Sequence, residues 1–294
     1  SWQHYSISKI CCQKNRSIKM IDKDRSKSLT IISLGAGVQS SAMALMAAKG
    51  ELPMPDYCIF ADTGFESKSC YLYLDLLEKI LPFPIIRVSA GNIKDDLKDY
   101  INESKRMPNA PFFTKEKTTG KKGMLMRQCT DGYKIQPIRQ KIRQLSGVKK
   151  GKHFPKDKYV EQWIGISTDE IQRMKPARDK YILNRHPLIE MKMSRQDCIN
   201  WMKKNEFPLP EKSACIFCPY HNDNFWYEMK KNNRSEFDEA VEIDKFIRKG
   251  NDKLTSELYL HRSLKPLDEI EFDKKETDKQ LDMFNNECEG MCGV

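Results

Sequence analysis

The chain has 294 residues, a formal net charge of +10 and ten cysteines, with a mean hydropathy of −0.67. No apolar run reaches the roughly 20 residues of a membrane-spanning helix, and residues 1–28 are basic and polar rather than an apolar leader. We therefore expect a cytoplasmic protein with no membrane partner, whose basic surface attracts polyanions and whose cysteines act as metal ligands or thiols.

The first periodic stretch predicts a strand, a tight turn and a helix. Residues 1–28 show no apolar period and are interpreted as a flexible basic arm, whereas residues 29–34 form a short apolar run typical of an interior parallel strand. The glycines that follow permit a sharp turn into a helix-forming run. A helix start of this kind binds anions through free N–H groups and the helix dipole. The candidate phosphate-binding residues here are Ser33, Gly35, Ala36, Gly37, Gln39, Ser40 and Ser41.

Two further strand–helix units follow. Residues 56–61 predict a second strand, residues 67–81 an amphipathic helix, and residues 84–89 a third strand. Asp62 and Thr63 come directly after the second strand, and the carboxyl ends of parallel strands are where α/β sheets bind ligands. Three such units in this order predict a doubly wound parallel sheet with right-handed crossovers.

The middle of the chain is less regular. Residues 92–104 predict a helix and residues 105–128 a long loop over the site. A basic helix at residues 139–145, a Lys/Gly-rich connector at 147–158 and a fourth strand at 159–167 complete this part.

The last third carries a Cys-x-x-Cys turn at Cys215 and Cys218, which brings two sulfurs close enough to bind one metal or to form a redox pair. We expect Ser194 to cap the start of a helix and Cys198 to be a buried, inert thiol inside that helix. Residues 225–249 predict helix, and we expect their apolar side chains to cover the sheet.

Several of these segments resemble the phosphoadenosine phosphosulfate (PAPS) reductase and N-type ATP pyrophosphatase superfamily. Residues 35–40 are similar to its pyrophosphate loop, usually Ser-Gly-Gly-x-Asp-Ser, with Gly35 in place of the first Ser and Gln39 in place of the Asp. Asp62, Thr63 and Gly64 resemble the Asp-Thr-Gly motif after the family's second strand.

Three more segments share the resemblance. Cys129 and Lys134 match a Cys-x-x-x-x-Lys-x-x-Pro segment, which implies that Lys134 contacts phosphate or sulfate. Ser167 replaces the first Arg of a Gly-x-Arg-x-x-Glu-Ser-x-x-Arg stretch. The residues that match that stretch are Gly165, Glu170 and Arg173. Near the end of the chain, Cys288 and Cys292 resemble the Glu-Cys-Gly tail whose cysteine attacks a sulfate sulfur.

The resemblance implies an adenine nucleotide alpha hydrolase-like, Rossmann-type domain at residues 29–221. Residues 222–294 would then be a helical extension with a mobile, cysteine-containing tail. It also implies that Cys129, Cys215 and Cys218 meet beside the nucleotide. Three interpretations stay open: a [4Fe–4S] cluster, a zinc site completed by His221 or a tail cysteine, or free thiols. No second Cys-x-x-Cys or Cys/His pair completes a zinc pattern, which favours the cluster.

The resemblance implies ATP or another adenine nucleotide as ligand, with Mg²⁺, and leaves three functions open. The first is ATP-dependent sulfur transfer from a sulfur donor to tRNA or DNA, which the basic charge favours. The second is reduction of a PAPS-like sulfonucleotide by a tail thiol with a thiol reductant, which the loss of the loop Asp at Gln39 favours. The third is a nucleotide- or nucleic-acid-binding regulator without turnover.

Overall fold

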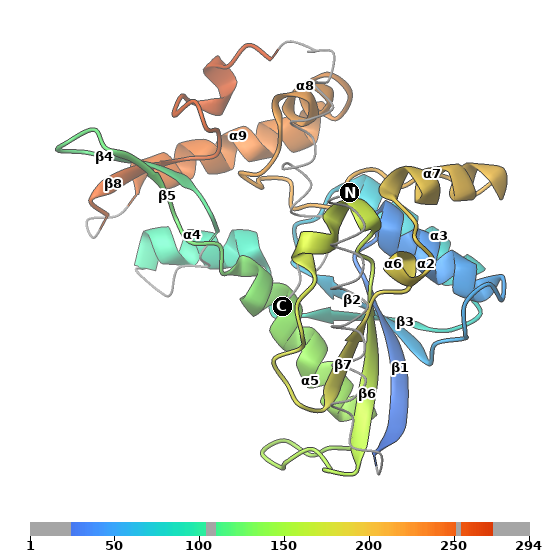
Figure 1. The fold of residues 1–294 in the computed structure, drawn as a ribbon. Coiled ribbons are helices and arrows are strands. Elements are labelled where there is room, and N and C mark those ends of the chain that lie inside the picture. The colour runs from blue at the N-terminus through green and yellow to red at the C-terminus, as the bar shows by residue number, and fades with distance from the viewer. Residues whose placement is uncertain (1–24, 104–109, 251–253, 273–294) are drawn as a thin grey trace, which may run out of the picture.

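The computed structural model describes residues 25–103, 110–250 and 254–272, which form two units (Figure 1). The first unit is a five-stranded sheet in the order β3-β2-β1-β6-β7, in which every neighbouring pair is parallel. Its strands are β1 (Ser26–Leu34), β2 (Tyr57–Asp62), β3 (Ile85–Ser89), β6 (Lys158–Ile164) and β7 (Ile182–Arg185). The predicted doubly wound α/β fold is confirmed.

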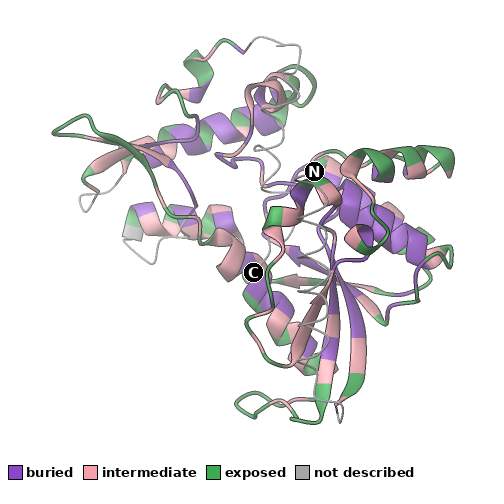
Figure 2. Cartoon of the chain, viewed as in Figure 1, coloured by how far each residue is buried: buried purple, intermediate pink, exposed green. Residues whose placement is uncertain are grey.

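Helices cover both faces of this sheet because successive strand residues point to opposite sides. Ile32 and Cys58 face one core, with α2 (Val38–Ala48), α3 (Lys68–Ile80) and α7 (Arg195–Lys204). Their strand neighbours Ile31 and Ile59 face the other core, with α5 (Gln136–Leu145). Figure 2 shows α2 as the most deeply buried helix of the unit.

The second unit joins segments that are far apart in the sequence. Its sheet has the order β5-β4-β8 and is antiparallel. Its elements are α4 (Ile93–Glu103), β4 (Phe113–Glu116), β5 (Lys122–Met124), α8 (Asp223–Asn232), α9 (Arg234–Lys249) and β8 (Ser256–Tyr259). The remaining short elements are a π-helical turn at Asp131–Ile135, α6 at Pro187–Glu190, and 3-10 turns at Thr168–Arg173 and Leu267–Glu269.

Several sequence-based expectations are wrong. Residues 105–128 are not one long loop, since residues 113–124 form the β4–β5 hairpin. Strand β4 of this hairpin also pairs with β8, a partner that local sequence does not reveal. Residues 26–28 belong to β1 rather than to the arm, and β7 is a strand that the sequence pattern does not predict. The apolar side chains of α8 and α9 do not cover the parallel sheet; they pack with α4, β4 and β8 in a separate core.

No helix in the described ranges is long and apolar enough to cross a membrane. The predicted boundary between residues 221 and 222 does not separate the two units, because the second unit takes α4, β4 and β5 from the earlier segment and α8, α9 and β8 from the later one.

Asp244 of α9 holds the second unit together from inside. Its side chain is fully buried, and its carboxylate accepts hydrogen bonds from the N–H groups of Leu260 at 3.0 Å and Leu267 at 2.9 Å. It also forms an ion pair with Arg248. One carboxylate thus joins α9 to the chain on both sides of residues 261–266.

Asp244→Ala should lower the free energy of unfolding by about 3–5 kcal/mol, because it leaves a buried charge and two buried N–H groups without their acceptor. Urea unfolding followed by tryptophan fluorescence measures this. The matched control is Asp238→Ala on the same helix, which removes an exposed pair with Arg234 and should change stability by about 0.5 kcal/mol or less. Equal losses in the two variants would contradict the assigned role.

His186 lies between β7 and α6 and is buried, with 7% of its surface exposed. Its Nε2 atom has no hydrogen-bond partner among the described residues. Burial lowers the pKa of His186 from 6.5 to about 4. The unfolded chain therefore binds a proton between these two values that the folded chain does not, so stability is lost as the pH falls through this window.

His186→Gln should flatten the pH dependence of unfolding between pH 6 and pH 5 by about 1.4 kcal/mol, the linkage contribution of one proton per pH unit. Urea unfolding at each pH measures the slope. His153→Gln, at an exposed histidine, is the control and should leave the slope unchanged. An identical slope in wild type and His186→Gln would show that His186 does not carry this effect.

Candidate functional site

The predicted phosphate loop lies at the carboxyl end of β1, the central strand. Its backbone is fixed from within, since the Ser40 hydroxyl accepts a hydrogen bond from the Gly35 N–H at 3.1 Å and donates one to the Gly37 carbonyl at 3.3 Å. Ala36 adopts φ of +56°, a left-handed conformation uncommon outside glycine. The helix begins at Val38, earlier than the sequence predicts, so Gln39, Ser40 and Ser41 lie in its first turn.

This loop stands where the order of strands in the sheet reverses. β1 is followed by β2 and β3 on one side, and the chain then returns to place β6 and β7 on the other. Ligands of open α/β sheets bind outside the carboxyl ends of the strands at such a switch point. The Gly35–Gly37 turn and the end of β6 therefore flank the position at which this fold binds ligands.

Gly165 brings β6 against the first turn of α2. A Cβ atom at this position would lie 2.8 Å from the Ser40 amide nitrogen and 2.9 Å from its Cα. Both are backbone atoms, which cannot move aside as the end of a side chain can. Nearby, the buried Gln162 side chain donates to the Ser33 hydroxyl at 2.6 Å, which links β6 to β1.

The residues predicted from the fourth strand meet the loop through Gln39. Its buried amide donates to Glu170 Oε2 at 3.1 Å and to Ser167 Oγ at 3.3 Å. The other carboxylate oxygen of Glu170 pairs with Arg173 at 2.5 Å. Residues 39, 167, 170 and 173 thus form one connected polar cluster beside the loop.

The turn after β2 is shaped by Asp62. One of its carboxylate oxygens accepts from the Gly64 N–H at 2.7 Å and from the Tyr71 hydroxyl at 2.8 Å. Gly64 has φ of +74°, and a Cβ atom there would lie 2.9 Å from the Cα of Asn92. Asp62 and Gly64 therefore fix the backbone from which Thr63 projects.

Thr63, Lys134 and Cys215 converge on Glu66. The Thr63 hydroxyl donates to Glu66 Oε1 at 3.1 Å and lies 3.2 Å from Cys215 Sγ. Lys134 Nζ is 3.2 Å from the same carboxylate oxygen, and the Glu66 side chain is fully buried. Glu66 is absent from the predicted site residues, although it closes the Asp-Thr-Gly-Phe-Glu stretch that the sequence makes visible.

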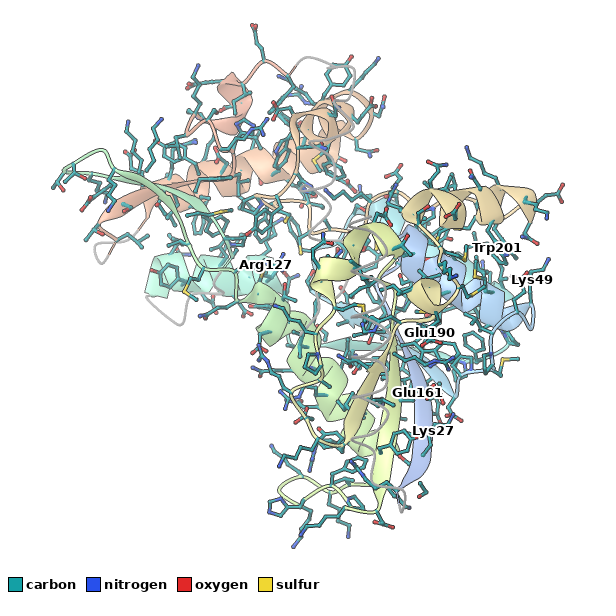
Figure 3. All side chains as sticks on the ribbon, viewed as in Figure 1. Lys27, Lys49, Arg127, Glu161, Glu190 and Trp201 are labelled. Carbon is teal, nitrogen blue, oxygen red and sulfur yellow. The ribbon has the colours of Figure 1, made fainter. Side chains whose placement is uncertain are left out.

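The three predicted metal-binding cysteines line one pocket of about 40 Å³ between the two units. Thr63 and Lys134 share its wall with Cys129, Cys215 and Cys218. Residues 215–218 are held against the turn after β2, because the Ile216 N–H donates to the Phe65 carbonyl at 3.1 Å. Arg127, labelled in Figure 3, lies where the units meet, with its guanidinium 5.4 Å from the Tyr220 ring centre.

His221 supports the Cys-x-x-Cys turn. Its Nε2 atom lies 2.9 Å from the Cys215 carbonyl oxygen, and its ring stacks on Phe225 with centres 3.8 Å apart. Burial lowers the pKa of His221 well below its ordinary value, so the ring is neutral and donates to the carbonyl from Nε2. Burial and the neighbouring Glu66 carboxylate raise the pKa of Cys215, which makes it a thiol in the absence of a metal.

The pocket offers three thiols as possible ligands. Among the described residues, no three His, Cys, Asp or Glu side chains are arranged to hold one metal ion. In a cluster each cysteine binds a different iron, so the ligand sulfurs surround a volume instead of converging on a point. Cys129, Cys215 and Cys218 line one pocket, and thiolates are the ligands that such a cluster uses. Cys288 and Cys292, the predicted tail thiols, lie outside the described residues.

No family profile matches the chain. An uncharacterized protein of the nin region of Escherichia phage lambda, ORF290, is 27% identical over 202 residues, which cover 65% of this chain and 65% of that protein.

Two solved structures are similar to the chain. They are the PAPS reductase from Candida auris in its phosphate complex (TM-score 0.41, 12% identity, 62% of this chain and 75% of that one) and the U34-tRNA thiolase NcsA from Methanococcus maripaludis with its [4Fe–4S] cluster (TM-score 0.37, 16% identity, 92% and 83%). Both names agree with the superfamily that the motifs resemble.

Gly165→Ala should lower the free energy of unfolding by about 1–3 kcal/mol, because the added methyl group meets backbone atoms of α2. Chemical denaturation measures this. Gly132→Ala is the matched control, since a Cβ atom there meets nothing within 4 Å, and it should be neutral or stabilising by up to about 1 kcal/mol. A Gly165→Ala protein as stable as the control would contradict the close approach of β6 and α2.

Proposed function

We propose that this protein is an adenine-nucleotide-dependent enzyme of sulfur chemistry, which transfers sulfur to a nucleic-acid acceptor with the help of an iron–sulfur cluster. One observation carries the proposal. Three cysteines from two distant segments line one pocket with Lys134 and Thr63, at the same sheet edge as the phosphate loop. Sulfur chemistry and nucleotide binding would then share one edge of the sheet.

The nucleotide would bind at the switch point. Its phosphates would accept hydrogen bonds from the N–H groups of residues 36 and 37 and of the first turn of α2, where the positive end of the helix dipole favours anions. Arg173 is the cation on the β6 side, oriented by Glu170. Mg²⁺ would accompany ATP and balance its phosphate charge.

In the proposed reaction, a carbonyl oxygen of a nucleic-acid base attacks the α-phosphorus of ATP, and pyrophosphate leaves. A sulfide then displaces AMP, which carries the former carbonyl oxygen away. Lys134 faces the thiol pocket, and its pairing with the buried Glu66 holds the ammonium group in one place. From there it would orient an anionic group of the activated acceptor.

Cys129, Cys215 and Cys218 would hold a [4Fe–4S] cluster. With three protein ligands, such a cluster supplies one iron that is open to bind a sulfide. Thr63 and Glu66 would contact the Cys215 side of the pocket, where their oxygens already lie near its sulfur. His221 would keep the Cys-x-x-Cys turn in place through the Cys215 carbonyl.

A second candidate is thiol-dependent reduction of a PAPS-like sulfonucleotide. Gln39 favours it, because the loop carries an amide, hydrogen bonded to Glu170 and Ser167, where ATP pyrophosphatases have a carboxylate. Release of pyrophosphate and AMP from ATP supports the first function, whereas release of sulfite from a sulfonucleotide supports the second. Nucleotide binding with neither product would support a regulator.

The cluster should give the anaerobically purified protein a broad absorption band near about 400 nm, with bound iron and sulfide. Cys129→Ala and Cys215→Ala should both lose the band and the iron, because each removes a ligand of the same cluster. Cys198→Ala is the matched control, since Cys198 is a fully buried free thiol in α7, away from the pocket.

Absorption spectra and iron and sulfide analysis of the four proteins decide the matter. A colourless wild-type protein, or iron retained in both pocket variants, would contradict the cluster. Zinc in the wild type that is lost in both variants would instead make the site structural. Loss of colour in Cys198→Ala as well would point to general unfolding, which circular dichroism detects.

A further inference from the structure

The opposite edge of the parallel sheet carries a dense group of cations. Residues 141–158, which run from α5 into β6, contain seven Lys or Arg residues and one acid, Asp157. Five of these lysines are exposed, together with two more at the amino ends of β1 and β7. We call these seven residues the amino-edge patch: Lys27, Lys149, Lys150, Lys152, Lys156, Lys158 and Lys180.

The backbone that carries the patch is anchored to the sheet. Phe154 of the connecting loop stacks on Tyr181 with ring centres 4.2 Å apart and an interplanar angle of 7°. Arg143 lies over the Tyr181 ring and donates to the Lys152 carbonyl. Arg25 donates to the carbonyls of Lys158 at 2.7 Å and Lys180 at 3.0 Å. The lysines therefore stand on a fixed base, which Figure 2 shows as exposed at the lower end of the sheet.

The charge of the patch is not neutralised locally. None of its seven lysines forms an ion pair with a described carboxylate. Lys27, labelled in Figure 3, lies on β1 toward this end of the sheet. Arg87, by contrast, is an exposed cation that pairs with two acids, Asp75 and Glu78. Clustered like charges without acids raise the local potential and attract a polyanion.

We infer that the amino-edge patch binds the phosphate backbone of a nucleic-acid duplex. A protein interface or a membrane anchor would need exposed apolar side chains, and none of the large exposed hydrophobic residues lies in 141–158. A single strand would need aromatic faces on which bases stack. Phe154 and Tyr181 stack on each other with Arg143 over Tyr181. Tyr159 of β6, opposite Lys27, is partly buried. The patch therefore favours recognition of a nucleic-acid duplex through contacts between its lysines and the phosphates.

This inference does not depend on the proposed enzymatic function. The patch lies at the amino ends of the strands, one strand length, about 20 Å, from the carboxyl edge with the thiol pocket. The inference deepens the proposed function if the acceptor is a nucleic acid. A duplex held at the amino edge of the sheet can extend past the carboxyl edge, where the thiol pocket lies. The test of this inference therefore uses no nucleotide and no turnover.

The test measures binding of a fluorescent duplex of about 20 base pairs by anisotropy, with DNA and RNA duplexes of mixed sequence, to the full chain. The variant carries Lys149→Gln, Lys150→Gln, Lys152→Gln and Lys156→Gln. The matched control carries Lys98→Gln, Lys203→Gln, Lys204→Gln and Lys265→Gln, at four other exposed lysines, and loses the same charge.

Four phosphate contacts predict that wild-type affinity falls about 100-fold between about 50 and 200 mM salt, since log K changes by about 0.9 per contact and per tenfold change in salt. The patch variant should lose most of this salt dependence and bind at least about tenfold more weakly at the lower salt concentration. The control should resemble the wild type, and all three should keep the absorption spectrum of the wild type.

Equal weakening in the patch variant and the control would overturn the inference, because net charge alone would then explain binding. So would an absence of duplex binding, or binding of anionic phosphatidylserine vesicles with no binding of duplex. Tighter binding of the DNA or of the RNA duplex shows which of the two nucleic acids the patch binds. A colourless wild type that still binds duplex through the patch would refute the cluster and leave this inference standing.

Discussion

The pairing of β1 on both sides is the constraint on which the site depends. Its register places Leu34 opposite Phe60 of β2, and Ser33 opposite Ile164 of β6. The ends of three strands thereby reach one edge together, and with them the loop at residues 35–37, the Asp62–Thr63 turn and Gly165. A shift of one residue would turn each side chain of β1 to the opposite face of the sheet, and so toward the wrong core. Gly165 then allows β6 to approach α2 within contact distance of its backbone.

The thiol pocket rests on a different kind of interaction, a buried charge pair. Removing Glu66 and Lys134 from water is costly, and their attraction repays this only where other hydrogen bonds complete the arrangement. Thr63 supplies one to Glu66, and Cys215 lies against both. The backbone bond from Ile216 to Phe65 fixes the cysteine turn to the same segment. Such a group is a poor source of stability and a good way to hold several polar side chains in one geometry.

Strands β1, β2, β3 and β6 could be predicted from the sequence because each carries apolar residues and is followed by a recognisable turn, whereas β7 could not. Gly165, Glu170 and Arg173 could be singled out for a different reason, their resemblance to a motif of the superfamily. The β4–β5 hairpin could not, because its residues are polar and its partner β8 lies about 140 residues further on. Glu66 was missed since no local pattern tells a buried carboxylate from an exposed helix cap. Its contacts with Lys134, 68 positions away, and with Cys215, 149 positions away, identify it.

Gln39 shows how one departure from the family pattern is accommodated. A carboxylate at this position would stand about 3 Å from Glu170, and two acids so close cannot both ionise without a cation between them. The amide instead donates to Glu170 and to Ser167, while the other carboxylate oxygen of Glu170 pairs with Arg173. Ser167 fits the same arrangement, because the arginine usual in the family would bring a second cation, whereas its hydroxyl accepts the remaining amide hydrogen. The two departures therefore belong together: both replace a charged side chain by a neutral one, so among residues 39, 167, 170 and 173 the charged groups are the carboxylate of Glu170 and the guanidinium of Arg173.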